Sequence, residues 1–497
     1  MELSTRAAIK RGTSEALAAA SLPENQLFIN GSFVPGASGD SFTVVDPSTG
    51  KGILEIPRAS VEEVDQAVLA AKEAFTEWGR ILPSERAAVL LKIADRLEEH
   101  QAELMALESL NTGKPSAVAE DDVSSAIDSF RFMAGALRSG TSLSAGEYAK
   151  DHLSMIVREP LGVIGAVTPW NYPLLMGVWK IAPILAAGNT LVLKPSETTP
   201  LSTLKFAQLT ADLLPAGVFN VLTGKGSVIG TRLSEHPEVA MVALTGSVGS
   251  GISVASVAAQ SVKRVHLELG GKAPVVVFED ADIEAAVAGI RSAGYWNSGQ
   301  ECGAACRVLV HESIAGEFTR RLGEAVSSLV VGEPGAGDEV EIGPMISKAH
   351  YDRVLEHLEK AKAEGASFVT GGGAMEGPGY FIEPTVIDAP QGASCTQEEI
   401  FGPVVSVETF STEQDALDRA NEVPFGLAAS VWTKDAQRSH FVASRLDAGT
   451  VWVNSHLALA TEMPWGGFKG SGYGRDLSAY AIDDYSRTKH VMHHTGR

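Results

Sequence analysis

Cys302 is the side chain of this sequence best suited to covalent chemistry. It ends the polar, glycine-containing run Trp296-Asn-Ser-Gly-Gln-Glu-Cys302, and the chain has only two other cysteines, Cys306 and Cys395. A cysteine thiolate is a strong nucleophile when its surroundings favour the charged form, whereas a buried cysteine more often only fills space. Cys302 and Cys306 lack a second pair of ligands at zinc-site spacing, so we expect no metal here. The role of Cys302 therefore depends on the residues that meet it.

Two further residues could complete a reaction at that thiol. Glu268 opens Glu268-Leu-Gly-Gly-Lys272 after an apolar run typical of a strand, and Asn171 lies in Thr168-Pro-Trp-Asn-Tyr-Pro173, between a predicted strand and a predicted helix. A thiolate can add to a carbonyl, a bound dinucleotide can accept a hydride, and a carboxylate can activate water against the thioester that remains. The Asn171 amide is placed to receive an oxyanion, although asparagine is also a common helix N-cap.

Two other junctions between predicted strands and helices have features of a dinucleotide site. In Lys194-Pro-Ser-Glu197 the acidic residue stands where a ribose hydroxyl is usually held, although a solvated turn has the same composition. The stretch 244–251, Leu-Thr-Gly-Ser-Val-Gly-Ser-Gly, exposes backbone N–H groups at a helix start and suits a pyrophosphate. A purely structural glycine turn is the alternative for that stretch.

The elements that carry these residues alternate between strands and helices. Uninterrupted apolar runs predict parallel strands that are covered on both faces; they lie at 162–167, 190–193, 219–222, 239–244 and 264–267. Helices at 201–214 and 229–235 separate some of them, which indicates a doubly wound α/β fold with ligands at the carboxyl ends of the strands. A second alternation follows residue 271, with strands predicted at 273–278, 306–311, 403–407 and 429–432.

The remaining segments frame these two halves. Residues 1–25 are predicted to form a loosely attached extension, and short strands follow between 27 and 56. Amphipathic helices are predicted at 61–78, 83–111 and 121–138, and a final strand is predicted at 485–494.

Composition narrows the class of protein. With 497 residues the chain should form two or three domains, and its formal charge, 40 − 61 = −21, argues against nucleic acid or an anionic membrane as a partner. Three cysteines indicate a reducing compartment without structural disulfides. We find no apolar run of the ~20 residues that a membrane span needs, and no signal peptide at the start. A cytoplasmic enzyme is the expectation.

Five motifs together resemble the aldehyde dehydrogenase superfamily. They are Thr168-Pro-Trp-Asn, Glu268-Leu-Gly-Gly-Lys, Gly299-Gln-Glu-Cys302, Glu399-Ile-Phe-Gly-Pro403 and Pro464-Trp-Gly-Gly-Phe-Lys469, and they occur in the order and spacing of that family. The resemblance implies an α/β fold with a Rossmann-type NAD-binding domain, a catalytic domain and a β-flap that joins subunits into homodimers or homotetramers. The implied limits are 26–139 and 160–270 for the first domain, 271–477 for the second, and 140–159 with 478–497 for the flap.

The resemblance also implies roles for single residues. Cys302 would be the nucleophile and Glu268 the base that activates water, while Asn171 and the Cys302 backbone N–H would form the oxyanion hole. The implied cofactor contacts are Thr168, Pro169, Trp170, Lys194, Ser196, Glu197, Gly246, Ser247, Gly251, Leu269, Glu399 and Phe401. Glu197 favours NAD, since a 2′-phosphate would meet like charge, although some relatives with this Lys-Pro-Ser-Glu sequence tolerate NADP.

Within the superfamily the chain is most similar to aminoaldehyde and betaine aldehyde dehydrogenases, particularly the bacterial γ-aminobutyraldehyde enzymes. Their aromatic box corresponds to Tyr172, Trp179, Trp296 and Trp465. Aromatic faces attract an ammonium group, although large aromatic side chains also line tunnels for uncharged aldehydes.

Acidic residues favour the cationic substrate. Glu301 precedes the nucleophile, where it opposes ionisation of the thiol unless a substrate cation pairs with it. Asp122, in the run 120–122, and Glu462 are further candidates, although charge runs are usually solvated helix starts. Thr450 stands where relatives differ in accepting the trimethylammonium group. We therefore expect an ω-aminoaldehyde substrate, with 4-aminobutanal first and 3-aminopropanal next; betaine aldehyde and uncharged aldehydes are the alternatives.

Three other functions remain open at this point. A thiol hydrolase without cofactor could use Cys302 and Glu268, but it would form no NADH. A binding protein on this scaffold would be expected to lose one of the two residues. An enzyme that transfers the acyl group to coenzyme A would be expected to lack the base at Glu268.

Overall fold

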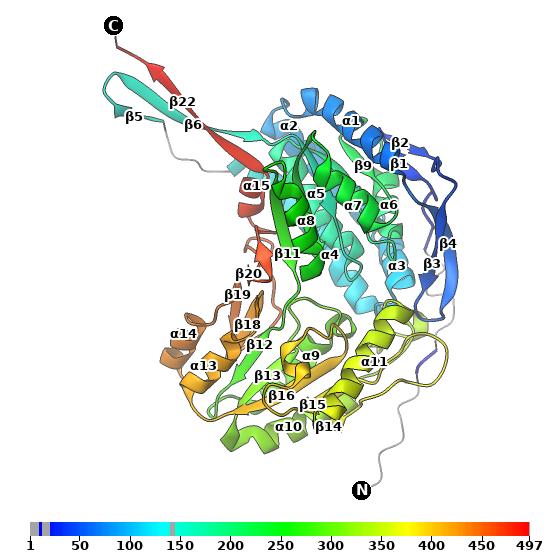
Figure 1. Ribbon diagram of the computed structural model, residues 1–497, viewed down its shortest axis with the longest axis vertical. Helices are drawn as coiled ribbons and strands as arrows, with labels where there is room; N and C mark the ends of the chain where they lie inside the picture. The colour runs from blue at the N-terminus through cyan, green and yellow to red at the C-terminus, as the bar shows by residue number, and fades with distance from the viewer. Residues whose placement is uncertain (1–8, 12–19, 140–144, 497) are drawn as a thin grey trace.

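Two β-sheets, one in each half of the chain, organise the protein (Figure 1). The computed structural model describes residues 9–11, 20–139 and 145–496. The first sheet has eight strands and the second has seven, and a third sheet of three strands forms an arm that projects from the body.

The first sheet has a parallel core with an antiparallel strand at each side. Its order is β2-β1-β9-β8-β7-β10-β11-β21. The bounds are β2 Ser32–Val34, β1 Leu27–Ile29, β9 Phe219–Val221, β8 Thr190–Lys194, β7 Val163–Val167, β10 Val239–Gly246, β11 Arg264–Leu269 and β21 Gly472–Tyr473. The strands β9, β8, β7, β10 and β11 are parallel, as predicted from their apolar runs. The strand β21, from the predicted catalytic domain, adds to this sheet beside Glu268.

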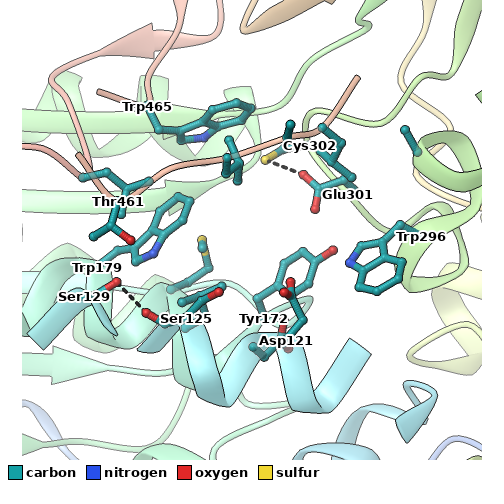
Figure 2. Close-up of a pocket in the computed structure, with 18 of the residues that line it drawn as sticks. Asp121, Ser125, Ser129, Tyr172, Trp179, Trp296, Glu301, Cys302, Thr461 and Trp465 are labelled. Atoms are coloured by element: carbon teal, nitrogen blue, oxygen red, sulfur yellow. Dashed lines mark hydrogen bonds between the residues drawn. The ribbon is translucent and has the colours of Figure 1, made fainter. Parts of the chain in front are cut away.

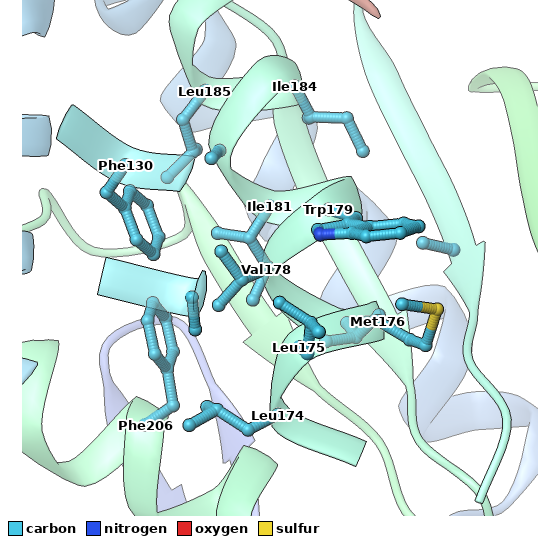
Figure 3. Packing of buried hydrophobic residues seen from close by; sticks show 14 of the residues in the cluster. Phe130, Leu174, Leu175, Met176, Val178, Trp179, Ile181, Ile184, Leu185 and Phe206 are labelled. Atoms are coloured by element: carbon cyan, nitrogen blue, oxygen red, sulfur yellow. The ribbon is translucent and has the colours of Figure 1, made fainter. Parts of the chain in front are cut away.

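Helices cover the first sheet and link its strands. They are α5 Pro173–Ala187, α6 Leu201–Thr210, α7 Gly226–Glu235 and α8 Val248–Ala259. All residues of α5 are buried, which is typical of a helix that is apolar all round. Figure 3 shows its side chains packed with Phe130 and Phe206, whose rings stack at 5.8 Å. Because α5 is buried along its whole length, it fixes the positions of Tyr172, its N-cap, and of Trp179 in its middle.

The N-terminal half also contributes four helices: α1 Val61–Trp78, α2 Pro83–Glu99, α3 Gln101–Thr112 and α4 Ser116–Ser139. The single helix predicted over 83–111 is wrong, because the chain breaks at His100, which ends α2 and begins α3. Gly113 ends α3 with φ 76°, and Pro344 leaves no room for a side chain there. The turn brings Lys114 and the start of α4 together beneath the site described below.

The second sheet follows the order β14-β15-β16-β13-β12-β18-β19. Its strands are β14 Ser367–Thr370, β15 Thr385–Asp388, β16 Val404–Phe410, β13 Arg307–His311, β12 Pro274–Val277, β18 Ala428–Trp432 and β19 Thr450–Val453. All but β14 are parallel. Its helices are α9 Ile283–Tyr295, α10 Glu312–Ser327, α11 Lys348–Ala363, α12 Ser394–Gln397, α13 Glu413–Asn421 and α14 Ala436–Ala443.

The arm is an antiparallel sheet of β5 Gly146–Ala149, β6 His152–Pro160 and β22 Ser486–His494. It corresponds to the predicted flap, of which residues 140–144 lie outside the described part of the chain. The helix α15, Tyr480–Asp484, belongs to the same predicted segment but packs against α5 at the base of the arm. Short pairs complete the fold: β3 Ser41–Asp46 with β4 Lys51–Pro57, and β17 Phe425–Gly426 with β20 Phe468–Lys469.

Part of the predicted N-terminal extension is attached rather than loose. Lys10 forms a parallel bridge with Gly332, and Arg11 pairs with Glu333 at 2.6 Å. Residues 1–8 and 12–19 of that extension lie outside the described part of the chain. Among the described residues, no helix combines the length and the apolar character that crossing a membrane requires.

Candidate active site

Cys302 lies between the two large sheets and lines two cavities. The first cavity has a volume of about 370 Å³ and the second about 360 Å³, and Cys302 is in the lining of both. Glu268 reaches the second cavity from β11 of the first sheet, while Cys302 comes from the loop before β13 of the second sheet. The carboxylate therefore comes from the first sheet and the nucleophile from the second half of the chain, as the sequence predicted.

The loop before Cys302 has an unusual backbone. The short 3-10 helix Trp296–Gly299 contains Asn297 and Ser298 at φ 49° and 59°, in the left-handed region that such residues rarely adopt. A Cβ on Gly299, at φ 69°, would lie 2.1 Å from the Gly402 carbonyl oxygen. Asn297 Nδ2 donates to the Asn171 carbonyl at 3.1 Å. Strain of this kind persists only where surrounding contacts enforce it, and here it fixes the approach of Cys302.

Asn171 is bound to the same loop. Its Nδ2 donates to the Gln300 carbonyl at 3.1 Å, and the residue lines the second cavity together with Cys302. The N-cap of α5 is Tyr172, so Asn171 stands one residue before the cap and its side chain does not cap the helix. The side chain is thus not used as a helix cap, and its role as an oxyanion donor stays a prediction.

The Cys302 thiol is strongly held in the protonated form in the free protein. Burial raises the pKa of Cys302 well above its usual range, and the charges of Glu268 and Glu301 raise it further. Cys302 Sγ donates to Glu301 Oε1 at 3.3 Å (Figure 2). Activation of this thiol therefore requires a change in its surroundings.

Glu268 is a buried carboxyl group that titrates near neutral pH. Its side chain accepts a hydrogen bond from Trp465 Nε1 at 3.1 Å. Burial raises the pKa of Glu268 to about 7, while the nearby Lys180 ammonium opposes the rise. A carboxylate with such a pKa can take a proton from water near neutral pH and release it again.

The second cavity has the features of a dinucleotide site. Glu399 accepts the Gly271 backbone N–H at 2.8 Å, and Phe401, at φ 59°, meets Trp170 edge-on at 5.3 Å. Thr245 lines this cavity, and its buried Oγ1 has no hydrogen-bond partner within the described residues. Ser247 lines the cavity at the start of α8, where its side chain caps the helix by accepting the Ser250 backbone N–H. Unpartnered donors and acceptors of this kind fit ribose hydroxyls and a pyrophosphate.

The first cavity has aromatic walls and an acidic side (Figure 2). Of the predicted substrate contacts, its lining includes Tyr172, Trp179, Trp296, Trp465, Glu301 and Asp122. Asp121, Ser125, Ser129, His456, Leu457 and Thr461 also line it. In Figure 2, Trp179, Tyr172 and Trp296 lie across the space from Cys302, and Trp465 lies on the same side as Cys302. The cavity can thus hold a short chain with a carbonyl at Cys302 and a cation among the rings and carboxylates.

The model of the aldehyde dehydrogenase family matches residues 33–491 of this chain. The chain belongs to the aldehyde dehydrogenase family. It is therefore an enzyme of the oxidoreductase class, and the predicted family and fold class are confirmed.

Among relatives of this aldehyde dehydrogenase, two plant enzymes match nearly the whole chain. The chloroplastic betaine aldehyde dehydrogenase of Atriplex hortensis is 41% identical over 488 residues, which are 95% of this chain and 96% of the relative. Aminoaldehyde dehydrogenase 2 of Pisum sativum, a peroxisomal protein, is 41% identical over 485 residues, which are 95% of this chain and 96% of the relative. The chain spans only 53% of the cytosolic 10-formyltetrahydrofolate dehydrogenase of Xenopus tropicalis, which is 42% identical over 478 residues, 94% of this chain.

Solved structures of aldehyde dehydrogenases also match nearly the whole chain. The crystal structure of betaine aldehyde dehydrogenase from Staphylococcus aureus in complex with NAD+ matches with a TM-score of 0.95 and 37% identity, covering 97% of this chain and 98% of that chain. A structure described as a putative aldehyde dehydrogenase from Burkholderia cenocepacia has a TM-score of 0.93 and 40% identity, covering 95% and 98%.

Several predicted cofactor residues of this aldehyde dehydrogenase do not line the second cavity. Those that do are Pro169, Trp170, Gly246, Ser247, Leu269, Glu399 and Phe401. Lys194 is buried and donates to the Pro195 carbonyl at 2.6 Å, and burial lowers the pKa of its ammonium to about 8. Glu197 lies 3.3 Å from Arg58, an ion pair that the sequence did not indicate. Ser196 Oγ accepts the Thr198 backbone N–H at 3.2 Å.

Thr168 and Gly251 have structural roles instead. The Thr168 backbone N–H donates to the Lys194 carbonyl at 3.1 Å, which joins β7 to β8 beyond the last strand residue. A Cβ on Gly251 would lie 2.6 Å from Leu269 Cδ1, so this glycine allows α8 to approach β11. Gly251 thus has a packing role in the structure, and its predicted contact with the cofactor stays a prediction.

Three residues predicted to contact the substrate have other surroundings in the structure. Asp122 lines the first cavity, but its carboxylate is paired with the buried Lys114, which also binds Glu108 at 3.0 Å. Thr450 lies on β19, paired with Ala428, and is not in the lining of the first cavity. Glu462 lines a separate cavity near α15. For Thr450, the position follows from the path of the chain, since the segment after β19 lines the first cavity only from His456 onward.

The sequence analysis missed His350, Arg353 and His456. His350 and Arg353 line the second cavity from α11, and His350 Nε2 donates to the Phe401 carbonyl at 2.6 Å. His456 lines the first cavity, where its Nε2 donates to the Gly303 carbonyl at 2.8 Å. Burial lowers the pKa of both imidazoles to about 4, so both are neutral at physiological pH. A single histidine in a sequence does not indicate which residues it will contact or how its pKa will shift. Only the contacts in the structure show this.

Proposed function

We propose that this protein is an NAD-dependent aldehyde dehydrogenase that oxidises an ω-aminoaldehyde, such as 4-aminobutanal, to the carboxylate. The observation that carries the substrate class is the first cavity, in which aromatic rings and the carboxylates of Asp121 and Glu301 surround the approach to Cys302. Aromatic faces bind ammonium groups with about 0.5–2 kcal/mol, and a nearby carboxylate adds to that attraction. An uncharged aldehyde would gain from neither.

In the proposed reaction, Cys302 Sγ forms a bond to the aldehyde carbon and gives a thiohemiacetal. The oxygen then bears negative charge, and the Asn171 amide together with the Cys302 backbone N–H is placed to receive it. The thiohemiacetal carbon would then lose a hydride, for which NAD held in the second cavity would supply the acceptor, and a thioester would remain on Cys302. Two electrons thus leave the substrate carbon as that hydride.

Hydrolysis of the thioester is assigned to Glu268. The carboxylate removes a proton from a water molecule as the water oxygen bonds to the thioester carbon, and the carbon–sulfur bond then breaks to return the cysteine. The pKa of Glu268 near 7 and its burial beside the second cavity support this role. Trp465 holds the carboxylate from the side of the first cavity.

The cofactor is proposed to lie along the second cavity. Glu399 and Phe401 would contact the ribose and ring next to Cys302, and Ser247 with the start of α8 would receive the pyrophosphate. Lys194, Ser196 and Glu197 are kept as contacts of the adenosine ribose, although they lie outside the cavity lining. Glu197 favours NAD, while its Arg58 partner reduces the charge that opposes a 2′-phosphate.

Assembly through the arm is the proposed oligomeric contact. The three-stranded sheet projects from the body (Figure 1), and Tyr148, Leu153, Val157 and Met492 are exposed on it. Apolar side chains on a projecting sheet favour a second copy of the chain as the partner. The homodimer or homotetramer stays a prediction, and so does the cytoplasmic location. Sedimentation of the wild type and of a variant lacking residues 486–497 would measure the oligomeric state.

The substrate proposal is tested by kcat/KM for 4-aminobutanal against butanal and hexanal with NAD. We expect at least about a tenfold preference for the amine, which corresponds to about 1.4 kcal/mol. Asp121→Asn should reduce this preference, because it removes a lining carboxylate. Thr450→Val is the matched control, since Thr450 lies outside the lining, and it should leave the preference unchanged. Equal rates for the amine and the uncharged aldehydes would exclude the proposed substrate class.

A further inference from the structure

Glu301 and Cys302 contact each other through their side chains. Cys302 Sγ donates to Glu301 Oε1 at 3.3 Å, and the same oxygen accepts the Gly303 backbone N–H at 2.9 Å (Figure 2). Side chains adjacent in sequence seldom converge in this way, because successive residues usually point apart. Here the turn at 301–303 brings the carboxylate back over the thiol.

The carboxylate is held in this position by its neighbours. His456 Nε2 donates to the Gly303 carbonyl at 2.8 Å, and His456 Nδ1 lies 2.8 Å from Ser430 Oγ of β18. A Cβ on Gly303 would lie 2.8 Å from Trp465 Cη2, so residue 303 lies flat against that ring. The Gly303 N–H therefore has a fixed position, and Glu301 is drawn to it and to Sγ together.

The other groups that face Cys302 are mainly acidic or neutral. Glu268 comes from β11, Glu399 from the loop before β16, and Tyr172 from the start of α5. The first cavity adds Asp121 and Asp122 from α4 and the neutral His456, and the second adds Arg353 and the neutral His350 from α11. Within the described part of the chain, no cationic side chain forms a salt bridge with Glu301. Glu301 interacts with the neutral hydroxyl of Tyr172, and in the absence of a cationic partner its charge also acts on the thiol.

We propose that the ammonium group of the substrate activates Cys302 by taking Glu301 away from the thiol. An ammonium group among the aromatic rings would pair with Glu301, remove its hydrogen bond to Sγ and offset its charge. The thiol then ionises and its proton passes to solvent in the cavity, and no oxidant or reductant is needed. An uncharged aldehyde leaves the Glu301–Cys302 contact in place and meets a protonated, weakly nucleophilic thiol. The inference rests on the proposed aminoaldehyde substrate and assigns Glu301 a second role beyond attraction.

This activation of Cys302 by the ammonium group of the substrate is called the switch below. It predicts a change in the ionisation of Cys302 that can be measured without NAD or turnover. The rate at which iodoacetamide alkylates Cys302 is measured at about pH 7.5, where butylamine is a cation, and the thiolate fraction that this rate reports gives the change in the apparent pKa. The Cys302→Ala variant is subtracted so that only Cys302 is observed. Butylamine serves as an unreactive cation, and 1-butanol serves as the uncharged match. Butylamine should lower the apparent pKa of Cys302 by about one unit, a tenfold change in the thiolate ratio, and 1-butanol should leave it unchanged.

Glu301→Gln separates the charge from the shape of the side chain. The amide can still accept the Gly303 N–H, but it carries no charge. The apparent pKa of Cys302 in this variant should be lower than in the wild type by about one unit without amine, and butylamine should produce no further shift. Glu317→Gln on α10, which removes an exposed carboxylate, is the control and should behave as the wild type. Thermal unfolding confirms that each variant is folded, and Glu301→Asp, whose shorter side chain draws back from Sγ, provides a second measurement if the amide variant is unstable.

The outcomes separate the switch from the proposed substrate. If calorimetry detects butylamine binding but the pKa of Cys302 does not move, the switch is wrong and the aminoaldehyde proposal stands. If butylamine does not bind, the aminoaldehyde proposal and the switch both fail. An unchanged pKa in folded Glu301→Gln or Glu301→Asp overturns the switch directly. Kinetics give an independent reading: Glu301→Gln should raise kcat/KM for butanal several-fold while it lowers kcat/KM for 4-aminobutanal.

Discussion

Trp465 Nε1 donates to Glu268 Oε1 over 3.1 Å, and the same tryptophan lines the cavity assigned to the substrate. Its backbone is fixed by two hydrogen bonds of 2.8 Å with Asp476, which in turn pairs with Lys180 at 2.5 Å. One side chain therefore forms the wall of the substrate pocket and supports the base that acts from the other side of the thiol. The geometry of binding and the acidity of the base are linked through this residue.

Removal of that hydrogen bond should raise the pKa of Glu268. The bond stabilises the carboxylate, so Trp465→Phe favours the protonated form and moves the value upward from about 7. Hydrolysis needs the carboxylate, so activity is lost as pH falls through this pKa, and the loss should occur at a higher pH in the variant. A hydrogen bond to a charged group is worth about 1.5–3 kcal/mol, which corresponds to a shift of roughly one to two units. The pH dependence of kcat measures it.

Trp432→Phe is the matched control for this substitution. Trp432 is buried in the second sheet, and its indole nitrogen has no hydrogen-bond partner within the described residues. Its pH profile should match the wild type. An unmoved profile in Trp465→Phe as well would show that the indole does not affect the base.

Glu268→Gln should separate oxidation from hydrolysis. The amide cannot take a proton from water, so the thioester should accumulate after one turnover, with loss of about 10²–10⁴ in the steady-state rate. Stopped-flow measurement should give a burst of NADH equal to the enzyme concentration, and mass spectrometry should detect the acyl group on Cys302. Steady turnover at the wild-type rate would assign the base to another residue.

Asn171→Leu should slow the formation of NADH itself. The variant keeps the approximate volume but removes the amide that faces the second cavity. Loss of one oxyanion donor costs about 10²–10³ in rate. The single-turnover burst rate measures this step, and it should fall in Asn171→Leu but not in Glu268→Gln. A normal burst rate with slow steady turnover would place Asn171 in hydrolysis alone.

Lys114→Met should destabilise the protein without direct loss of a reacting group. Lys114 is fully buried between Glu108 and Asp122, and its ring contact with Tyr172 is 4.8 Å. Breaking a buried ion pair typically costs about 3–5 kcal/mol, because the remaining carboxylates stay buried. Burial already raises the pKa of Asp122 well above its usual range, so the variant should lose more stability at neutral pH than at acidic pH, where Asp122 is protonated.

Urea denaturation at two pH values measures the effect of Lys114→Met. Lys348→Met is the control, because Lys348 pairs with Asp352 on the exposed face of α11. The control should unfold like the wild type at both pH values. Equal stability of Lys114→Met and the wild type would show that this buried cluster adds nothing to the free energy of unfolding.

The sequence allowed the parallel strands and the main site residues to be predicted because both depend on local signals. Apolar runs identify β7, β8, β10 and β11, and Glu268 and Asn171 follow strands at the edge where ligands bind. Contacts between distant segments could not be predicted in this way. The pairing of Asp122 with Lys114 and of Glu197 with Arg58, and the placement of His456 against Gly303, each depend on where the chain returns in space.

Cys302 lines both cavities, and this position gives a reagent two independent routes to one sulfur atom. A compound that fills the aromatic pocket closes one route and leaves the sulfur exposed to oxidants or alkylating agents from the other. To protect Cys302 from oxidation during storage or oxidative stress, ligands must therefore occupy both cavities. A single molecule that extends past the sulfur from one cavity into the other would be enough to shield it. An inhibitor of this shape would be expected to be selective for the enzyme.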